Sequence, residues 1–192
     1  MKSVTRAITL TRQLSSFSRK REVKLQEVDC NILISNMRQM LDRLVRKNIV
    51  LKDELTSEST LVMAHPGELE QVIMNLSINA WDAMPDGGKF IIRTMVVHLP
   101  FPQPGPESRL LPGTYIMIQV SDTGCGMDRE TIAHAFEPLF TTKKEGEGTG
   151  LGLSIVYGNI IGIGGYIDID STPGEGTTFR ILLPRLKKTS GE

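Results

Sequence analysis

The sequence is short of cysteine, has no excess of charge of either sign and contains no long apolar run. Its two cysteines, Cys30 and Cys125, are far apart and form no CxxC pair, so we expect free structural thiols in a reducing compartment and no cysteine metal site. Basic and acidic residues number 22 each, which removes any general attraction to nucleic acid or anionic lipid. No apolar run approaches the ~20 residues of a membrane span, and the first residues lack a signal peptide's apolar core. We therefore expect a cytoplasmic segment without nucleic-acid or direct membrane contact, whether or not its parent protein is membrane-bound.

What the sequence does contain is the composition of an ordinary globular domain. Of 192 residues, 40% are hydrophobic and 23% are charged, which fits one domain plus a short additional element. Residues 1–21 hold basic residues, no acid, and apolar residues at helical spacing. They favour an amphipathic helix that packs on another helix, from this chain or a second one, over a solvated basic tail. We expect the globular domain to span 22–186, followed by a tail at 187–192.

Hydrophobic periodicity and turn residues divide this domain into strands and helices. Apolar alternation predicts strands at 24–28, 49–55, 60–64, 89–99, 114–120, 166–170 and 177–183. Helical spacing predicts helices at 30–47, 69–84, 131–136 and 151–161, with Asp29 and Asp128 as N-caps and Pro66 in the first turn of the second. Several strands adjoin without a helix between them. This favours an α+β sandwich, with one mixed sheet covered by helices on one side, over a doubly wound parallel sheet.

The helix at 69–84 organises the rest, because its polar residues form one narrow stripe walled by apolar residues on both sides. The stripe consists of Glu68, Gln71, Asn75, Asn79 and Asp82. Two amides one turn apart offer oxygen to a hard cation and N–H groups to phosphate, which suggests a lined pocket. The alternative is the solvent face of an amphipathic helix. The opposite face, with Glu70 and Ser77, is also expected to touch water.

Residues 122–127 place a carboxylate at the end of a predicted strand. Asp122 can accept a hydrogen bond from an exocyclic amine there, and Gly124 and Gly126 let the backbone approach a flat ring. The same residues are also typical of an ordinary turn.

Two further glycine-containing segments have both a functional and a structural explanation. Residues 146–153 lead directly into a helix and offer an anion cradle, to which Lys143 adds charge, although a flexible linker has a similar composition. Residues 174–179 form a hairpin turn, from which Thr177 can offer a hydroxyl to a ring nitrogen or to its bridging water.

Taken in order, these segments resemble the conserved boxes of a known family. The N, G1, F, G2 and G3 boxes of the sensor histidine kinases are similar to residues 70–80, 122–127, 136–140, 146–153 and 174–179. The resemblance spans about 23–184, and the run Asp-Ala-Met-Pro-Asp-Gly-Gly is similar to the kinases that often follow PAS sensor modules. It implies the ATP-binding Bergerat-type fold of the GHKL superfamily: a two-layer α/β sandwich whose mixed, mostly antiparallel sheet is covered by helices on one face.

The resemblance also implies roles for individual residues. Asn79 would coordinate a Mg²⁺ that bridges the phosphates of ATP, Asp122 would bind the adenine amino group and Phe140 would anchor an ATP lid. Asn75 and Lys143 are the implied catalytic residues, since Asn75 helps to hold the metal and Lys143 lies near the terminal phosphate. An amide at Asn75 is a poor general base, which favours transfer to a protein side chain over hydrolysis. The full implied ATP site is Asn75, Asn79, Asp82, Asp122, Gly124, Gly126, Phe140, Thr142, Lys143, Gly148, Thr149, Gly150, Leu151, Gly152 and Thr177.

The sequence lacks the histidine that the family phosphorylates. His65, His98 and His134 do not fit that position, while 4–21 resembles the end of the second helix of the family's dimerisation hairpin. We therefore expect the acceptor histidine on an upstream domain, a homodimer in the full-length protein and a response regulator receiver domain as partner. The isolated chain is expected not to autophosphorylate.

Three alternatives remain open from the sequence. A gyrase- or chaperone-type ATPase would need a general base in place of Asn75 and a longer chain. A non-catalytic nucleotide-binding module would keep the same boxes without transferring phosphate. A serine kinase of the anti-sigma type also shares the boxes, but the basic stub at 1–21 favours the sensor class.

Overall fold

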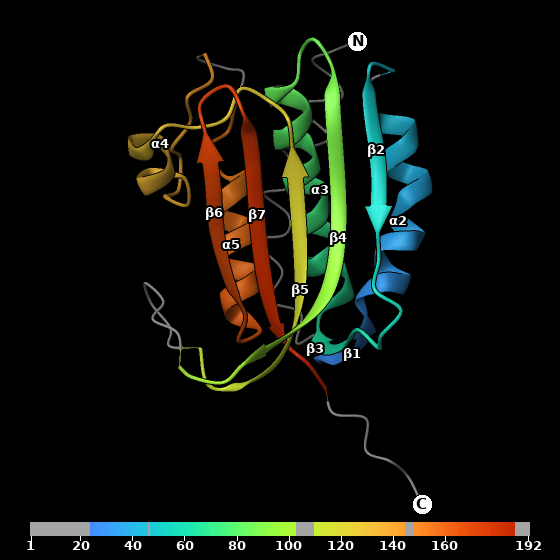
Figure 1. Ribbon diagram of the computed structural model, residues 1–192. Helices are drawn as coiled ribbons and strands as arrows, with labels where there is room; N and C mark the ends of the chain where they lie inside the picture. Colours follow the sequence, from blue (N-terminus) through green and yellow to red (C-terminus); the bar gives the residue numbers. More distant parts are fainter. Residues whose placement is uncertain (1–23, 46, 103–109, 145–147, 187–192) are drawn as a thin grey trace, which may run out of the picture.

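The structure is a computed structural model that describes residues 24–45, 47–102, 110–144 and 148–186 (Figure 1). The expected helix in 1–21 and the tail at 187–192 therefore lie outside the described residues. One sheet contains, in spatial order, β2 (Ile49–Glu54), β4 (Gly88–Leu99), β5 (Gly113–Asp122), β7 (Gly176–Pro184) and β6 (Tyr166–Thr172). Only the β2–β4 pair is parallel, so the sheet is mixed and mostly antiparallel, as expected.

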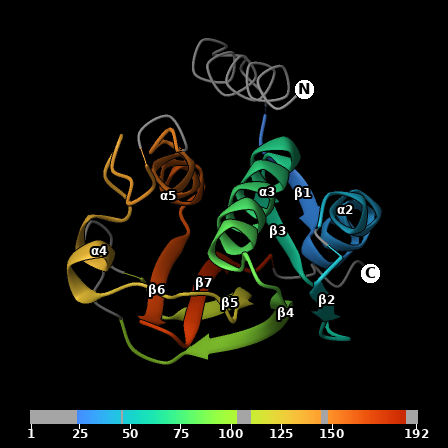
Figure 2. The ribbon, with the colours of Figure 1, turned by 90° about the horizontal axis from the view of Figure 1, so that it is seen from above.

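Three helices cover one face of this sheet: α2 (Cys30–Leu44), α3 (Pro66–Ala83) and α5 (Gly152–Gly162). Seen from above, they lie side by side with α3 in the middle (Figure 2). The short helix α4 (Arg129–His134) lies beyond the β6 edge. The predicted α+β sandwich is thus confirmed.

The predicted strands at 24–28 and 60–64 do not join the main sheet. They form a separate antiparallel ribbon of β1 (Gln26–Asp29) and β3 (Leu61–Ala64). The chain returns to this ribbon after β7, where Arg185 forms a bridge with Val62 and the Leu186 N–H donates to the Leu61 carbonyl. The expectation of a single sheet was therefore incomplete, because alternation predicts strands but not which strands pair.

The helix starts follow the predicted caps. Asp29 accepts hydrogen bonds from the N–H groups of Asn31 and Ile32, and Asp128 accepts one from Thr131. Pro66 begins α3, whose N-cap residue His65 makes no side-chain capping bond. Helix α2 ends at Leu44, three residues before the predicted 47, because the next residue, Val45, has an extended backbone.

Alternate residues of the strands pack against the helices to form the core, including Phe90, Ile92, Ile116 and Ile181. Ser77 is fully buried, and its hydroxyl donates to the Ile73 carbonyl at 2.7 Å. The expectation that Ser77 touches water was wrong, because a middle helix exposes only a narrow part of its surface, which includes Glu70.

Both cysteines are free thiols, as expected. Burial raises the pKa of Cys30 to about 12 and makes it inert, whereas Cys125 is exposed. No helix in the described residues is long and apolar enough to cross a membrane.

Candidate nucleotide-binding site

The polar stripe of α3 contacts α5 along part of its length. At its lower end the Asn159 amide on α5 donates to the Glu68 carbonyl at 3.4 Å and to the Gln71 side-chain oxygen at 3.5 Å. Higher up, the Asn75 amide donates to the Gly152 carbonyl at 3.2 Å. Asn75 is only 6% exposed. The stripe is therefore not simply the solvent face of an amphipathic helix, and the lined pocket stays a prediction.

The start of α5 adds backbone N–H groups beside the Asn75 amide. The Leu151 N–H donates to the Thr149 hydroxyl, and the helix then begins at Gly152 without a side-chain cap. Gly152 lies next to Asn79, since a Cβ placed on this glycine would be 3.9 Å from the Asn79 amide nitrogen. The first N–H groups of a helix are unpaired and carry partial positive charge, so this end can bind an anion beside the two amides.

The segment between α4 and α5, called the lid segment here (residues 139–144 and 148–151), is closed at its base by two residues. The Leu139 N–H donates to the Gly150 carbonyl at 3.0 Å. Gly150 has φ +66°, and a Cβ there would collide with the Leu139 backbone, so glycine is required. Leu139, with φ +69°, is the one non-glycine residue of the described chain with positive φ. Such strain commonly accompanies functional loops.

Two side chains connect the lid segment to the rest of the molecule. The Phe140 ring packs against His134 with centroids 5.7 Å apart, which agrees with an anchoring role. The Lys143 ammonium lies 2.6 Å from an Asp82 carboxylate oxygen, so the lid segment is ion-paired to the last turn of α3. Thr142 is exposed and makes no side-chain hydrogen bond with any described residue. Its predicted contact with ATP therefore rests on the resemblance alone.

At the opposite end of the site Asp122 is 9% exposed and lies opposite Thr177 in the β5–β7 register. Burial raises the pKa of Asp122, and backbone hydrogen bonds from Gly124 and Thr177 partly offset this rise. The Thr177 hydroxyl in turn lies 2.9 Å from the Ser171 hydroxyl. A buried carboxylate beside hydroxyl groups can accept a hydrogen bond from a ring amine, which is the predicted chemistry of this end.

Gly124 and Gly126 have packing reasons of their own. A Cβ on Gly124 would lie 2.7 Å from the Ala83 Cβ, and one on Gly126 would collide with the Thr172 carbonyl. The Cys125 N–H donates to the Ala83 carbonyl at 3.0 Å, which ties this turn to the end of α3. Close approach of these two glycines to a ring stays a prediction.

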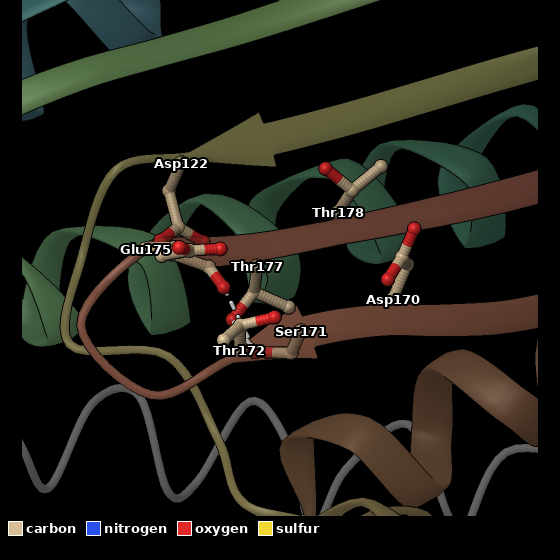
Figure 3. A pocket seen from close by; sticks show the side chains of 8 residues that line it. Asp122, Asp170, Ser171, Thr172, Glu175, Thr177 and Thr178 are labelled. Carbon is tan, nitrogen blue, oxygen red and sulfur yellow. Dashed lines mark hydrogen bonds between the residues drawn. The ribbon is translucent and has the colours of Figure 1, made fainter.

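A polar hollow of about 170 Å³ opens beside Asp122, at the turn between β6 and β7 (Figure 3). Figure 3 shows Glu175 next to Asp122, with Ser171, Thr172 and Thr177 below them. Neither α3 nor the lid segment contributes to its lining. The hollow therefore borders only the Asp122 end of the candidate site.

Comparison with known proteins identifies the family. Residues 64–187 match the family described as Histidine kinase-, DNA gyrase B-, and HSP90-like ATPase, which is more than half of the chain. The chain belongs to this ATPase family. Membership implies that the nucleotide of the site is ATP.

Curated relatives of this ATPase-family chain are sensor kinases. Sensor kinase CckA of Brucella abortus (strain 2308) is 42% identical over 184 residues, covering 96% of this chain and 20% of that protein. Sensor histidine kinase ZraS of Escherichia coli (strain K12) is 32% identical over 186 residues, covering 95% of this chain and 36% of that protein. The chain thus spans only a fifth to little more than a third of these relatives.

Solved histidine kinase structures share the fold. The catalytic domain of histidine kinase ThkA has a TM-score of 0.67 at 28% identity, covering 84% of this chain and 96% of that chain. A complex of ThkA with the response regulator protein TrrA has a TM-score of 0.68 at 24% identity, covering 96% of this chain and 49% of that chain, and shows likeness of fold alone. The resemblance to histidine kinase catalytic domains is confirmed.

The structure places several of the implied ATP-site residues of this family member in contact with one another, in three groups. Asn75 and Asn79 lie against Gly152 at the start of α5, and Asp82 pairs with Lys143. Asp122 and Thr177 are partners in the β5–β7 register. The sequence reasoning missed Asn159, which closes the lower stripe. A signal existed, because this polar residue follows Gly152 by two helical turns in an otherwise apolar helix and so shares its face.

Proposed function

We propose that this chain is the catalytic ATP-binding domain of a sensor histidine kinase, which transfers the γ-phosphoryl group of ATP to a histidine on a separate dimerisation domain. The observation that carries the proposal is the meeting of Asn75 and Asn79 with the uncapped start of α5, under a lid segment that contributes Lys143. The proposal places amides, helix-terminal N–H groups and an ammonium around the phosphates of one nucleotide. Phosphoryl transfer needs little more than such positioning and charge neutralisation.

The donors at the phosphate end fit Mg²⁺ shared with a nucleotide. The described residues contain no group of three or more His, Cys, Asp or Glu able to hold a metal ion. Mg²⁺ characteristically uses one or two protein oxygens plus substrate phosphates and water, so the Asn79 amide oxygen suffices as protein ligand. When bound, the metal would neutralise charge on the transferred phosphoryl group.

An ATP-hydrolysing enzyme of the gyrase or chaperone type is the second candidate, and the side chain of Asn75 argues against it. Its side chain is an amide that donates to the Gly152 carbonyl, so it offers no base to activate water. Turnover of ATP by the isolated chain would favour this candidate instead.

The first test is calorimetric titration with a non-hydrolysable ATP analogue in the presence of Mg²⁺. We expect binding by the wild-type chain and a loss of about tenfold or more in Asn79→Ala, since a metal ligand is removed. Asn36→Ala, at an exposed position on α2, is the matched control and should bind as the wild type does. Affinity that is unchanged in Asn79→Ala would remove this residue from the site. A wild-type chain that binds no analogue would refute the proposal and favour a degenerate module that only recognises partners.

The second test supplies the missing acceptor. His65 is half-buried before α3, His98 lies on β4 beside the Thr114 hydroxyl, and His134 pairs with Glu137. With labelled ATP alone the chain should therefore gain no stable phosphohistidine. Addition of a dimerisation hairpin from the same protein should give label on the hairpin. Stable label on this chain itself would contradict the proposal.

We further propose that the full-length protein is a homodimer in the cytoplasm whose partner is a response regulator receiver domain. The sensor kinase relatives support this assignment. Cross-linking of a longer chain that includes the upstream helices tests the dimer.

A further inference from the structure

Asp82 is an unusual residue for its position. It lies in the last turn of α3, where the helix dipole disfavours negative charge, and that turn contains no basic residue. It also follows Asn79 on the stripe that faces the proposed phosphates, so it would repel a polyanion. A residue that is unfavourable on both counts is expected to have a function.

Lys143 of the lid segment neutralises this carboxylate. The two charged groups are 2.6 Å apart, with side chains about one-third exposed for Lys143 and 40% exposed for Asp82. The lysine is also placed by its own loop. Its N–H donates to the Thr141 hydroxyl, and a Cβ on Gly148 would lie 3.2 Å from the Lys143 Cδ, so glycine leaves room for the lysine stem.

The two partners differ in how firmly they are held. Asp82 belongs to a long helix whose end is tied to the following turn by the Cys125 N–H bond to the Ala83 carbonyl. Lys143 belongs to a loop whose described contact with α3 is this ion pair. When the pair breaks, the lysine therefore moves and the carboxylate stays.

We propose that Asp82 is the resting counter-ion of Lys143, and that the terminal phosphate of ATP competes with Asp82 for this lysine. Binding of ATP then exchanges one ion pair for another, whereas ADP, which lacks that phosphate, leaves Lys143 on Asp82. Asp82 is thus a positioning residue that restrains ATP affinity and returns the lysine after transfer. This inference rests on the proposed function and deepens it.

The experiment measures binding of the Mg²⁺ complexes of a non-hydrolysable ATP analogue and of ADP by calorimetry. Asp82→Asn should bind the analogue more tightly by up to about fivefold, the value of an exposed ion pair. ADP affinity should stay within about twofold, since ADP does not use the lysine. Asp86→Asn removes the same charge from a nearby exposed residue without an ion pair to another described residue, and it should change neither affinity.

A second arm asks whether the effect acts through the lysine. Lys143→Met should weaken binding of the ATP analogue, and Asp82→Asn should add nothing on that background. Lys144→Met is the matched control, because Lys144 is exposed and unpaired within the described residues. Thermal unfolding of each variant verifies that α3 remains folded.

The outcomes separate this inference from the proposed function. Weaker binding of the analogue by Asp82→Asn would show that the carboxylate itself helps to hold ligand or metal, and would overturn the exchange. If Asp82→Asn binds both nucleotides more tightly, also in the Lys143→Met background, the effect is repulsion between Asp82 and the nucleotide, and the exchange of ion pairs is refuted. Unchanged affinity for the ATP analogue in Asp82→Asn would refute the exchange as well. A wild-type chain that binds neither nucleotide would instead refute the proposed function.

Discussion

The Asn75 amide donates a hydrogen bond to the Gly152 carbonyl at 3.2 Å, and this bond joins the middle of α3 to the first residue of α5. It fixes the uncapped end of α5 against the helix that carries Asn79. The same contact explains why an amide, rather than a carboxylate, suits this position. A carboxylate would face the carbonyl oxygen without a proton to donate.

Replacement of Asn75 tests this relationship. Asn75→Asp should lower the free energy of unfolding by about 1–3 kcal/mol, because it removes the hydrogen bond to the Gly152 carbonyl and places a charge at a buried position. Urea denaturation measures the change. Asn36→Asp on the exposed face of α2 is the matched substitution and should be nearly neutral. Equal stability of the two variants would mean that the Asn75 bond contributes nothing.

Replacement by alanine should change stability in opposite directions at two glycines, Gly150 at the base of the lid segment and Gly158 within α5. Gly150→Ala should destabilise the chain by roughly 1–3 kcal/mol and weaken nucleotide binding, since alanine is strained at φ +66° and its Cβ collides with Leu139. Gly158→Ala, within α5 with no atom near its added Cβ, should stabilise by about 0.5–1 kcal/mol. Thermal and urea unfolding of both variants, with nucleotide titration, tests this. A Gly150→Ala variant as stable as Gly158→Ala would contradict it.

The start of α3 lacks a side-chain cap and can be improved. His65 has the extended backbone that an N-cap requires, and its backbone carbonyl accepts from the Glu68 and Leu69 N–H groups. Its side chain makes no capping bond, and the buried Nδ1 has no partner among the described residues. His65→Asp should raise the free energy of unfolding by about 1 kcal/mol through capping and the helix dipole. Asp29→Ala, which removes a working cap from α2, should have the opposite sign. A loss of stability in His65→Asp would show that the histidine packing matters more.

The buried Asp122 links function to a cost in stability. Burial raises the pKa of Asp122, so its ionised form is disfavoured in the folded chain. The free energy of unfolding is therefore greatest at acidic pH, where Asp122 is protonated. It decreases as the pH rises through the raised pKa. Asp122→Asn keeps an oxygen for the Gly124 N–H and removes the charge. We expect this variant to be more stable than the wild type at neutral pH, with a difference that shrinks on acidification, and to lose affinity for ATP. Urea denaturation across the acid-to-neutral range measures the first effect, and a difference independent of pH would exclude ionisation of Asp122 as its cause.

Local patterns in the sequence predicted the elements, while the contacts between elements needed the structure. The polar stripe of α3 and the caps at Asp29 and Asp128 follow from spacing along one element, and the structure has them where they were expected. The burial of Ser77 depends on α3 having a helix on each side, which no periodicity within α3 records.

The same limit applies to the site. The resemblance named Asp82 and Lys143 as ATP-site residues, but it did not indicate that they pair with each other across 61 residues of chain. Likewise, the alternation in 24–28 and 60–64 predicted two strands and left open that they form a ribbon of their own. Pairing partners are set by packing of distant segments, to which a single sequence gives few clues.

The return of the chain to β3 after β7 has a topological consequence. Strand β1 pairs with one side of β3, and Arg185 pairs with the other. The backbones of β1 and Arg185 are therefore about 10 Å apart, which is twice the spacing of neighbouring strands. This corner lies at the opposite end of the sheet from the tip of β5, where Asp122 is located (Figure 1). A short peptide can therefore connect Leu186 to the start of β1 in a circular permutant of residues 24–186, and this junction lies away from the Asp122 end of the sheet.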